Sequence, residues 1–355
     1  MPQSPANDKH PTKPLIYILT GPTGSGKSAL AIRLAQVMGA EIIGADAFQV
    51  YDGLAIGTAR TLPEEMGGIS HHLIGFLSPL ASFSAGAWCR LAEAKIDDIA
   101  SRGHPIIVCG GTGLYLHFLL HYLGGGTEES VEDAQRGETP QDIASSKSPV
   151  SPDGPTPLER PSPPLFPPEE AASWYQVMVE EDPIQASRIH PNDHYRIQRY
   201  FLRRAARQGA PKSQTDQEDF TSTPKYSYHG VFLDPPRPLL YDHLNRRCAQ
   251  MFADGLLAET QALIAAYPGI EAAQSFRAIG YHNAAQVLHG TMTEDTAIAD
   301  FAQKTRRYAK RQLTWFRHHD DLQPLSLDSL VDAGQLDQVA AQIAALWDGP
   351  DFGPL

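Results

Sequence analysis

The sequence contains few cysteines and no long apolar run, and both shortages restrict the class of protein. Its 355 residues include only three cysteines, Cys89, Cys109 and Cys248, and these form no C-x-x-C pair. Neither a disulfide framework nor a cysteine zinc site is indicated, so we expect a cytoplasmic location. No stretch approaches the eighteen or more apolar residues of a membrane span, and the first fourteen residues lack an apolar signal core. We therefore expect a soluble protein without membrane association.

The chain as a whole also lacks the positive charge that favours a nucleic-acid partner, because its formal net charge is −12. The charge is unevenly distributed, however. Residues 124–170 hold ten acids against three bases, whereas residues 301–317 hold six bases and no acid. The acidic total is thus compatible with a local basic surface that could bind phosphate groups.

The length suggests about two domains, and the composition changes abruptly at Gly124. Nine of the twenty residues from Pro149 to Pro168 are proline, and such a tract buries too little apolar surface to offset the entropy of ordering. The predicted organisation is a disordered tail (1–14), a first part of the core (15–123), an acidic Pro-rich insertion (124–168), a helical segment (169–211), a second part of the core (212–320) and a C-terminal extension (321–355).

The most specific motif is Gly21-Pro22-Thr23-Gly24-Ser25-Gly26-Lys27-Ser28, which lies between an apolar run, 15–19, and a segment of helical periodicity, 29–35. This order of strand, glycine loop and helix is typical of a P-loop. Glycines let backbone N–H groups surround phosphate oxygens, Lys27 adds a charge, and the Ser28 hydroxyl can hold Mg²⁺. The loop leaves open which polyphosphate is bound and whether it is transferred, hydrolysed or released as a leaving group.

The motif also predicts the fold class. We expect an α/β protein with a P-loop NTPase-like parallel sheet flanked by helices, together with a smaller helical insertion domain. Further strands are predicted at 41–46, 105–109 and 231–233. Helices are predicted at 84–100, 114–123, 174–181, 184–189, 192–208, 239–267, 295–317 and 336–347.

Two candidate site residues follow predicted strands. Asp46 ends the strand at 41–46, and Thr112 lies in the glycine turn after the strand at 105–109. Ligands bind at the carboxyl ends of strands in parallel α/β sheets, so both are candidates for ligand contact, although either could serve only in a turn. The pair His71-His72 suggests a metal, but no third ligand accompanies it at a recognisable spacing, which favours packing or hydrogen bonding instead.

Two predicted helices carry basic faces. Arg196, Arg199, Arg203 and Arg207 share one face of the helix at 192–208, and Lys304, Arg307 and Arg311 share one face of the helix at 295–317. For both, the alternatives are a solvated face and a track for RNA phosphate.

Taken in order, these motifs resemble those of the tRNA dimethylallyltransferase family, the tRNA isopentenyltransferases, from Leu15 to about Arg317. The stretches that carry the resemblance are Gly21 to Ser28, Ala45 to Tyr51, Ile56 to Arg60, His71 to Leu73, Gly110 to Tyr115, Arg188 to Asp193, Ala278 to Tyr281 and Thr305 to Arg317.

The resemblance implies transfer of a dimethylallyl group from dimethylallyl diphosphate to N6 of adenosine 37, in tRNAs that read codons beginning with U. It implies that the P-loop holds the leaving diphosphate with Mg²⁺ as cofactor. It also implies that Asp46 is the general base and that Thr23, Thr112 and Arg247 contact the donor or the reacting adenosine.

The same resemblance assigns the contacts to tRNA. They fall in three stretches: Asp46, Ala47, Phe48 and Gln49; Tyr195, Arg196, Ile197, Gln198 and Arg199; and Arg277, Ala278, Ile279, Gly280, Tyr281 and His282. The segment 169–211 is expected to clamp the anticodon stem-loop, and the protein to be a monomer. The chain departs from the family pattern at Ala47, Asp52, Tyr195 and His282, and in its acidic insertion.

Three other functions are compatible with parts of this pattern. An adenylate isopentenyltransferase would use the same donor but a free nucleotide, for which the basic helix at 305–317 would be needless. A P-loop nucleotide kinase would consume ATP without prenyl transfer. A non-catalytic tRNA-binding relic would bind tRNA without turnover, which the intact Asp46 and Lys27 argue against.

Overall fold

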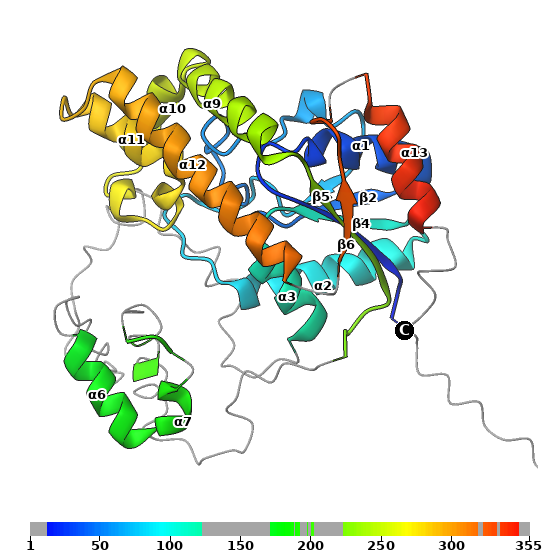
Figure 1. Cartoon of the computed structure of the whole chain (residues 1–355), viewed down its shortest axis with the longest axis horizontal. Helices are drawn as coiled ribbons and strands as arrows, with labels where there is room; N and C mark the ends of the chain where they lie inside the picture. Colours follow the sequence, from blue (N-terminus) through cyan, green and yellow to red (C-terminus); the bar gives the residue numbers. More distant parts are fainter. Residues whose placement is uncertain are drawn as a thin grey trace, which may run out of the picture. The chain divides into compact units, whose positions relative to one another are not determined.

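The structure is a computed structural model (Figure 1), and it describes residues 13–122, 171–187, 189–191, 197, 200–201, 223–318, 322–331 and 334–347. The chain forms two compact units. The core unit comprises Met1–Ser145 and Glu218–Leu355, and the insertion unit comprises Ser146–Gln217.

A six-stranded, all-parallel sheet forms the centre of the core unit, in the order β3-β2-β4-β1-β5-β6. Its strands are β1 (Ile16–Thr20), β2 (Glu41–Gly44), β3 (His71–His72), β4 (Ile106–Gly110), β5 (Tyr228–Asp234) and β6 (Gln323–Ser326). The predicted α/β fold is confirmed. Strand β6 has no counterpart among the predicted strands, because this edge strand is mostly exposed and contains Pro324, which a central strand would not tolerate.

Helices cover both faces of the sheet (Figure 1). The helix α1 (Lys27–Met38) packs beside α13 (Leu336–Trp347) on one face, while α2 (Ala85–Ser101) and α3 (Gly113–His121) lie together on the other. Successive strand residues point to opposite faces. Ile18 accordingly joins the core under α2 and α3, and Leu19 joins the core under α1 and α13.

The second part of the core unit adds a group of helices that continues the α2 side. It consists of α9 (Arg237–Ala253), α10 (Leu256–Ala266), α11 (Ile279–Leu288) and α12 (Glu294–Arg317), with short 3₁₀ turns η3 (Ile270–Ala272) and η4 (Ser275–Arg277). The helix predicted at 239–267 is two helices. The break lies at Gly255, whose φ of 106° is in the region that glycine adopts readily.

The insertion unit is described only in part. It contains α6 (Ala171–Glu181) and α7 (Pro183–Ala186), and the Asp182 side chain caps α7 by accepting a hydrogen bond from the Gln185 N–H. Ile197 is buried against Trp174 and Phe201. Most of the helix predicted at 192–208 lies outside the described residues.

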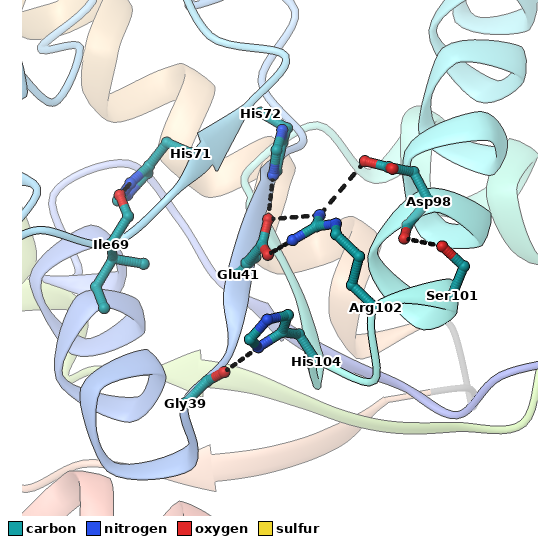
Figure 2. Close-up of polar contacts among 9 residues, drawn as sticks. All are labelled: Gly39, Glu41, Ile69, His71, His72, Asp98, Ser101, Arg102 and His104. Carbon is teal, nitrogen blue, oxygen red and sulfur yellow. Dashed lines mark hydrogen bonds and ion pairs between the residues drawn. The ribbon is translucent and has the colours of Figure 1, made fainter.

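At the amino end of β2, charged side chains satisfy one another (Figure 2). The buried carboxylate of Glu41 accepts hydrogen bonds from the Arg102 guanidinium, and it lies 2.7 Å from Nε2 of His72. Nδ1 of His71 lies 2.9 Å from the Ile69 carbonyl oxygen. Both histidines therefore form hydrogen bonds within the protein, in keeping with the interpretation that the sequence favoured.

The short 3₁₀ turn η1 (Pro63–Glu65) completes the elements of the core unit. Among the helices in the described ranges, none combines the length and apolar character that crossing a membrane requires.

Candidate active site

Three loops meet at the carboxyl end of the sheet. The P-loop follows β1, Asp46 follows β2, and the turn Gly111 to Gly113 follows β4. These strands are neighbours in the order β2-β4-β1, so the loops lie side by side although they are far apart in the sequence. This is the edge at which parallel α/β sheets bind ligands.

The P-loop is held by its own backbone. The Ser25 N–H donates to the Pro22 carbonyl at 3.3 Å, and Gly24 and Gly26 have φ values of 79° and 83°, which side-chain-bearing residues rarely adopt. The Ser25 hydroxyl is buried and has no hydrogen-bond partner within the structure. A buried polar group without a partner is costly, so this hydroxyl is suited to an incoming phosphate oxygen.

Two enclosed cations lie at this loop: Lys27 belongs to it, and Arg247 comes from α9. Burial lowers the pKa of Lys27, while nearby Cys109 and Asp46 act in the opposite direction. Burial likewise lowers the pKa of Arg247, again opposed in part by Asp46. Enclosure disfavours a charged group unless an opposite charge compensates it. One carboxylate beside two enclosed cations therefore leaves a positive site that favours a polyanion.

Hydrogen bonds fix the orientation of Asp46. Its Oδ1 accepts from the backbone N–H groups of Phe48 at 3.0 Å and Gln49 at 3.3 Å. Asp46 thus does form the turn that the sequence allowed. The same bonds hold its carboxylate in a defined direction beside the P-loop, as a general base requires.

The second glycine turn connects Asp46 to α12. The Thr112 Oγ1 accepts from the Ala47 N–H at 3.0 Å. A Cβ on Gly113 would lie 2.4 Å from the Trp315 ring, so only glycine allows α12 to approach so closely. Trp315 is partly buried and packs against the core under α2 and α3.

Gln312 is a site residue to which the sequence assigned no role. It is buried on α12 and hydrogen-bonds both the P-loop and the second glycine turn. Its place within the family-like stretch from Thr305 to Arg317 was the available signal. The residue type alone does not distinguish Gln312, which faces the site, from Gln303, an exposed glutamine on the same helix.

A basic cavity of about 500 Å³ lies between α12 and the segment from η3 to α11. Its lining includes four basic residues, one histidine and one acid: Arg277, Lys304, Arg307, Arg311, His282 and Glu271. The structure thus brings together the predicted tRNA-contact stretch 277–282 and the basic face of Lys304, Arg307 and Arg311, which are separate in the sequence. Ala278, Gly280 and Tyr281 of the first stretch are buried, and the Tyr281 hydroxyl donates to the Glu259 carboxylate.

Of the predicted tRNA-contact stretch 195–199, Ile197 is buried in the insertion unit. The other four residues, Tyr195, Arg196, Gln198 and Arg199, lie outside the described part of the chain. Asp52, one of the departures from the family pattern, is exposed and lies 3.5 Å from the Arg60 guanidinium.

The fold and site together define a P-loop α/β protein whose glycine loop lies beside a fixed carboxylate. The family model described as IPP transferase matches residues 49–319, and the model described as isopentenyl transferase matches residues 14–75. The chain is 39% identical to a tRNA dimethylallyltransferase of Myxococcus xanthus over 305 residues, which cover 86% of this chain and 90% of that relative.

Solved structures agree with this result. A tRNA isopentenylpyrophosphate transferase of Bacillus halodurans matches with a TM-score of 0.62 and 31% identity, covering 94% of this chain and 97% of that one. A eukaryotic dimethylallyltransferase acting on tRNA matches with a TM-score of 0.66 and 25% identity, covering 93% of this chain and 77% of that one. The chain therefore belongs to the tRNA dimethylallyltransferase family, and it is a prenyltransferase.

Proposed function

We propose that this protein transfers a dimethylallyl group from dimethylallyl diphosphate to N6 of adenosine 37 in tRNAs that read codons beginning with U. The observation that carries the proposal is the meeting of Lys27, Asp46 and Thr112 at one edge of the sheet, in a chain of this family. The edge combines a positive site for a leaving diphosphate with a carboxylate that can accept a proton.

In the proposed reaction, the adenine N6 attacks the C1 carbon of the donor as the C1–O bond breaks. The bonding electrons leave with the diphosphate, whose growing charge Lys27, Arg247 and the P-loop N–H groups stabilise. The proton lost from N6 passes to the Asp46 carboxylate, which is oriented by the Phe48 and Gln49 N–H groups. Diphosphate and the N6-alkylated adenosine are the products.

We propose Mg²⁺ as the cofactor. Ser28 borders a small cavity whose lining includes Gln49, Thr61 and His71 besides Ala31, Ile42, Gly44, Ile74 and Cys109. Of these groups the Ser28 hydroxyl, an oxygen ligand of the kind this hard cation prefers, would hold the ion. When bound there with the diphosphate, Mg²⁺ would supply further charge neutralisation. The buried, unpaired Ser25 hydroxyl of the same loop supports a polar ligand at the P-loop.

The basic cavity supports an RNA acceptor. A mononucleotide would fill only the site beside Asp46 and the P-loop. The basic cavity provides a second positive surface, formed by Arg277, Lys304, Arg307 and Arg311, that fits the backbone phosphates of an anticodon stem-loop. The target adenine would have to leave its stack to reach Asp46. We propose a cytoplasmic monomer as the working form.

The decisive experiment incubates the purified protein with labelled dimethylallyl diphosphate, Mg²⁺ and either an anticodon stem-loop or AMP. Label in the stem-loop but not in AMP is expected. Label in AMP alone would replace the proposal with an adenylate isopentenyltransferase. As a cellular counterpart, mass spectrometry of tRNA should show N6-dimethylallyl adenosine at position 37 only in cells that contain the protein.

A further inference from the structure

A single side chain joins the two glycine-rich turns of the site. Gln312 is buried on α12, and both ends of its amide are used. Oε1 accepts from the Thr23 N–H at 2.8 Å, and Nε2 donates to the Gly111 carbonyl at 2.7 Å. Thr23 belongs to the P-loop and Gly111 to the turn after β4. The amide therefore fixes the spacing between loops that follow different strands.

The bridge lies where the donor and acceptor sides of the site meet. A Cβ on Gly111 would lie 2.4 Å from Nε2 of Gln312 and 3.5 Å from Nζ of Lys27. The next residue, Thr112, is bonded to the Ala47 N–H beside Asp46. A displacement of Gln312 would therefore reach the phosphate loop on one side and the neighbour of the general base on the other.

The helix that carries Gln312 also carries the RNA-facing bases. Lys304 and Arg307 line the basic cavity from earlier turns of α12, and Arg311 lines it from the turn that holds Gln312. The carboxyl-terminal part of α12 packs against α3, which follows the second glycine turn (Figure 1). A helix of this length is a rigid element. It thus connects the surface proposed to bind RNA with the loop proposed to bind the donor.

We propose that Gln312 is a positioning residue that sets the distance between the diphosphate-binding loop and the acceptor side of the site. This inference rests on the proposed function. Attack on the allylic carbon requires the reacting atoms to be about 3–3.5 Å apart, and a misplacement of about 1 Å can reduce the rate about 10²-fold. Gln312 acts on backbone groups of the two loops, so its removal should affect the rate more than the binding of either substrate.

The test compares Gln312→Met with Gln303→Met. Methionine keeps the length and volume of glutamine but forms neither hydrogen bond, and Gln303 is an exposed glutamine on the same helix. For each protein, kcat, the KM for dimethylallyl diphosphate and the Kd for the stem-loop are measured, with kcat referred to folded protein by active-site titration. Gln312→Met should lower kcat about 10- to 100-fold and leave the stem-loop Kd within about twofold, whereas Gln303→Met should match the wild type.

A kcat of Gln312→Met within twofold of the wild type would overturn the inference, as would a loss of activity that disappears once the rate is referred to the folded protein. If Gln312→Met does not fold, Gly111→Ala provides the second test, because its Cβ would push the Gln312 amide away. The same kcat loss is expected, and wild-type kcat would again overturn the inference. If the wild type itself transfers no dimethylallyl group, the proposed function is wrong. If the wild type and the variant transfer it at the same rate, only the inference about Gln312 is wrong.

Discussion

Charged side chains are paired with one another at one end of the β-sheet and are left partly uncompensated at the other. At the amino end of β2, Glu41, His72 and Arg102 pair with one another (Figure 2). At the carboxyl ends of β1 and β2, Lys27 and Arg247 are enclosed with Asp46 as a shared, more distant counter-charge. The first arrangement is charge-compensated by its own side chains, whereas the second has two cations for one carboxylate and is thus suited to an anion.

The difference separates stability from function within one sheet. Groups that satisfy one another add to folding and leave nothing for a ligand. Groups held apart by backbone hydrogen bonds, as Asp46 is by Phe48 and Gln49, keep their charge available for a reaction. Substitutions at the carboxyl end should therefore change the rate, and substitutions at the amino end should change only the stability.

The largest effect is expected for Asp46→Asn. Asparagine can still accept the Phe48 and Gln49 N–H groups, so the turn persists, but it cannot take the N6 proton. We expect kcat to fall about 10³-fold while the Kd for dimethylallyl diphosphate, measured by calorimetry, stays close to that of the wild type. Asp52→Asn, an exposed position in the same loop region, is the control. Retention of wild-type kcat by Asp46→Asn would remove the general-base role and leave the family assignment intact.

The next largest effect is expected for Lys27→Met. The substitution removes the charge that faces the leaving diphosphate but keeps most of the side-chain volume. We expect kcat/KM for the donor to fall about 10²-fold, while the Kd for the stem-loop is unchanged because the basic cavity lies elsewhere. Lys95→Met, on the outer part of α2, is the matched control. Equal loss of donor and RNA binding would show that Lys27 supports the fold rather than the leaving group.

A smaller effect is expected for Thr112→Val. Valine has the shape of threonine but leaves the Ala47 N–H without its acceptor, which costs about 1–3 kcal/mol and loosens the chain beside Asp46. We expect an approximately tenfold lower kcat, measured with saturating donor. Thr112→Ser keeps the hydroxyl and should recover most of the rate. If serine and valine behave alike, the methyl contacts and not the hydroxyl hold the turn.

These three residues also show how far the sequence could be interpreted. The P-loop was recognisable because its glycines, Lys27 and Ser28 form a local pattern whose chemistry follows from backbone geometry. Asp46 and Thr112 could be placed at the carboxyl edge, since both follow apolar strand-like runs. The long helix at 295–317 and the helix at 336–347 were recognisable from their periodicity, and the structure confirms both.

What the sequence could not provide were contacts that depend on three-dimensional packing. Gln312 touches Thr23 and Gly111 only because α12 crosses the ends of two strands that are distant in sequence. Likewise, Glu259 binds the N–H groups of Ile56 and Gly57 from α10, and no local pattern marks it. Strand β6 was missed because its four residues carry neither an apolar run nor alternation.

The smallest effect on activity, and a distinct effect on stability, is expected for Glu41→Gln. The hydrogen bond from Arg102, with a smaller contribution from His72, lowers the pKa of Glu41 to about 2 from its ordinary value of 4.5. A carboxyl whose pKa is depressed by folding contributes stability above its unfolded pKa, and this contribution is lost as the pH falls from about 4.5 towards about 2.

At pH 7, Glu41→Gln should therefore lower the free energy of unfolding by about 1–2 kcal/mol, after allowance for the partial exposure of Arg102. The difference from the wild type should shrink as the pH falls from about 4.5 towards about 2, since the wild-type carboxyl is protonated first in the unfolded chain and near pH 2 in the folded protein as well. Urea unfolding across this pH range measures it, with the exposed Glu64→Gln as the control. A loss of prenyl transfer by folded Glu41→Gln at 25 °C would contradict the expectation that substitutions at the amino end of the sheet change the stability and not the rate. A pH-independent difference would instead mean that shape, and not charge, holds Glu41 in place.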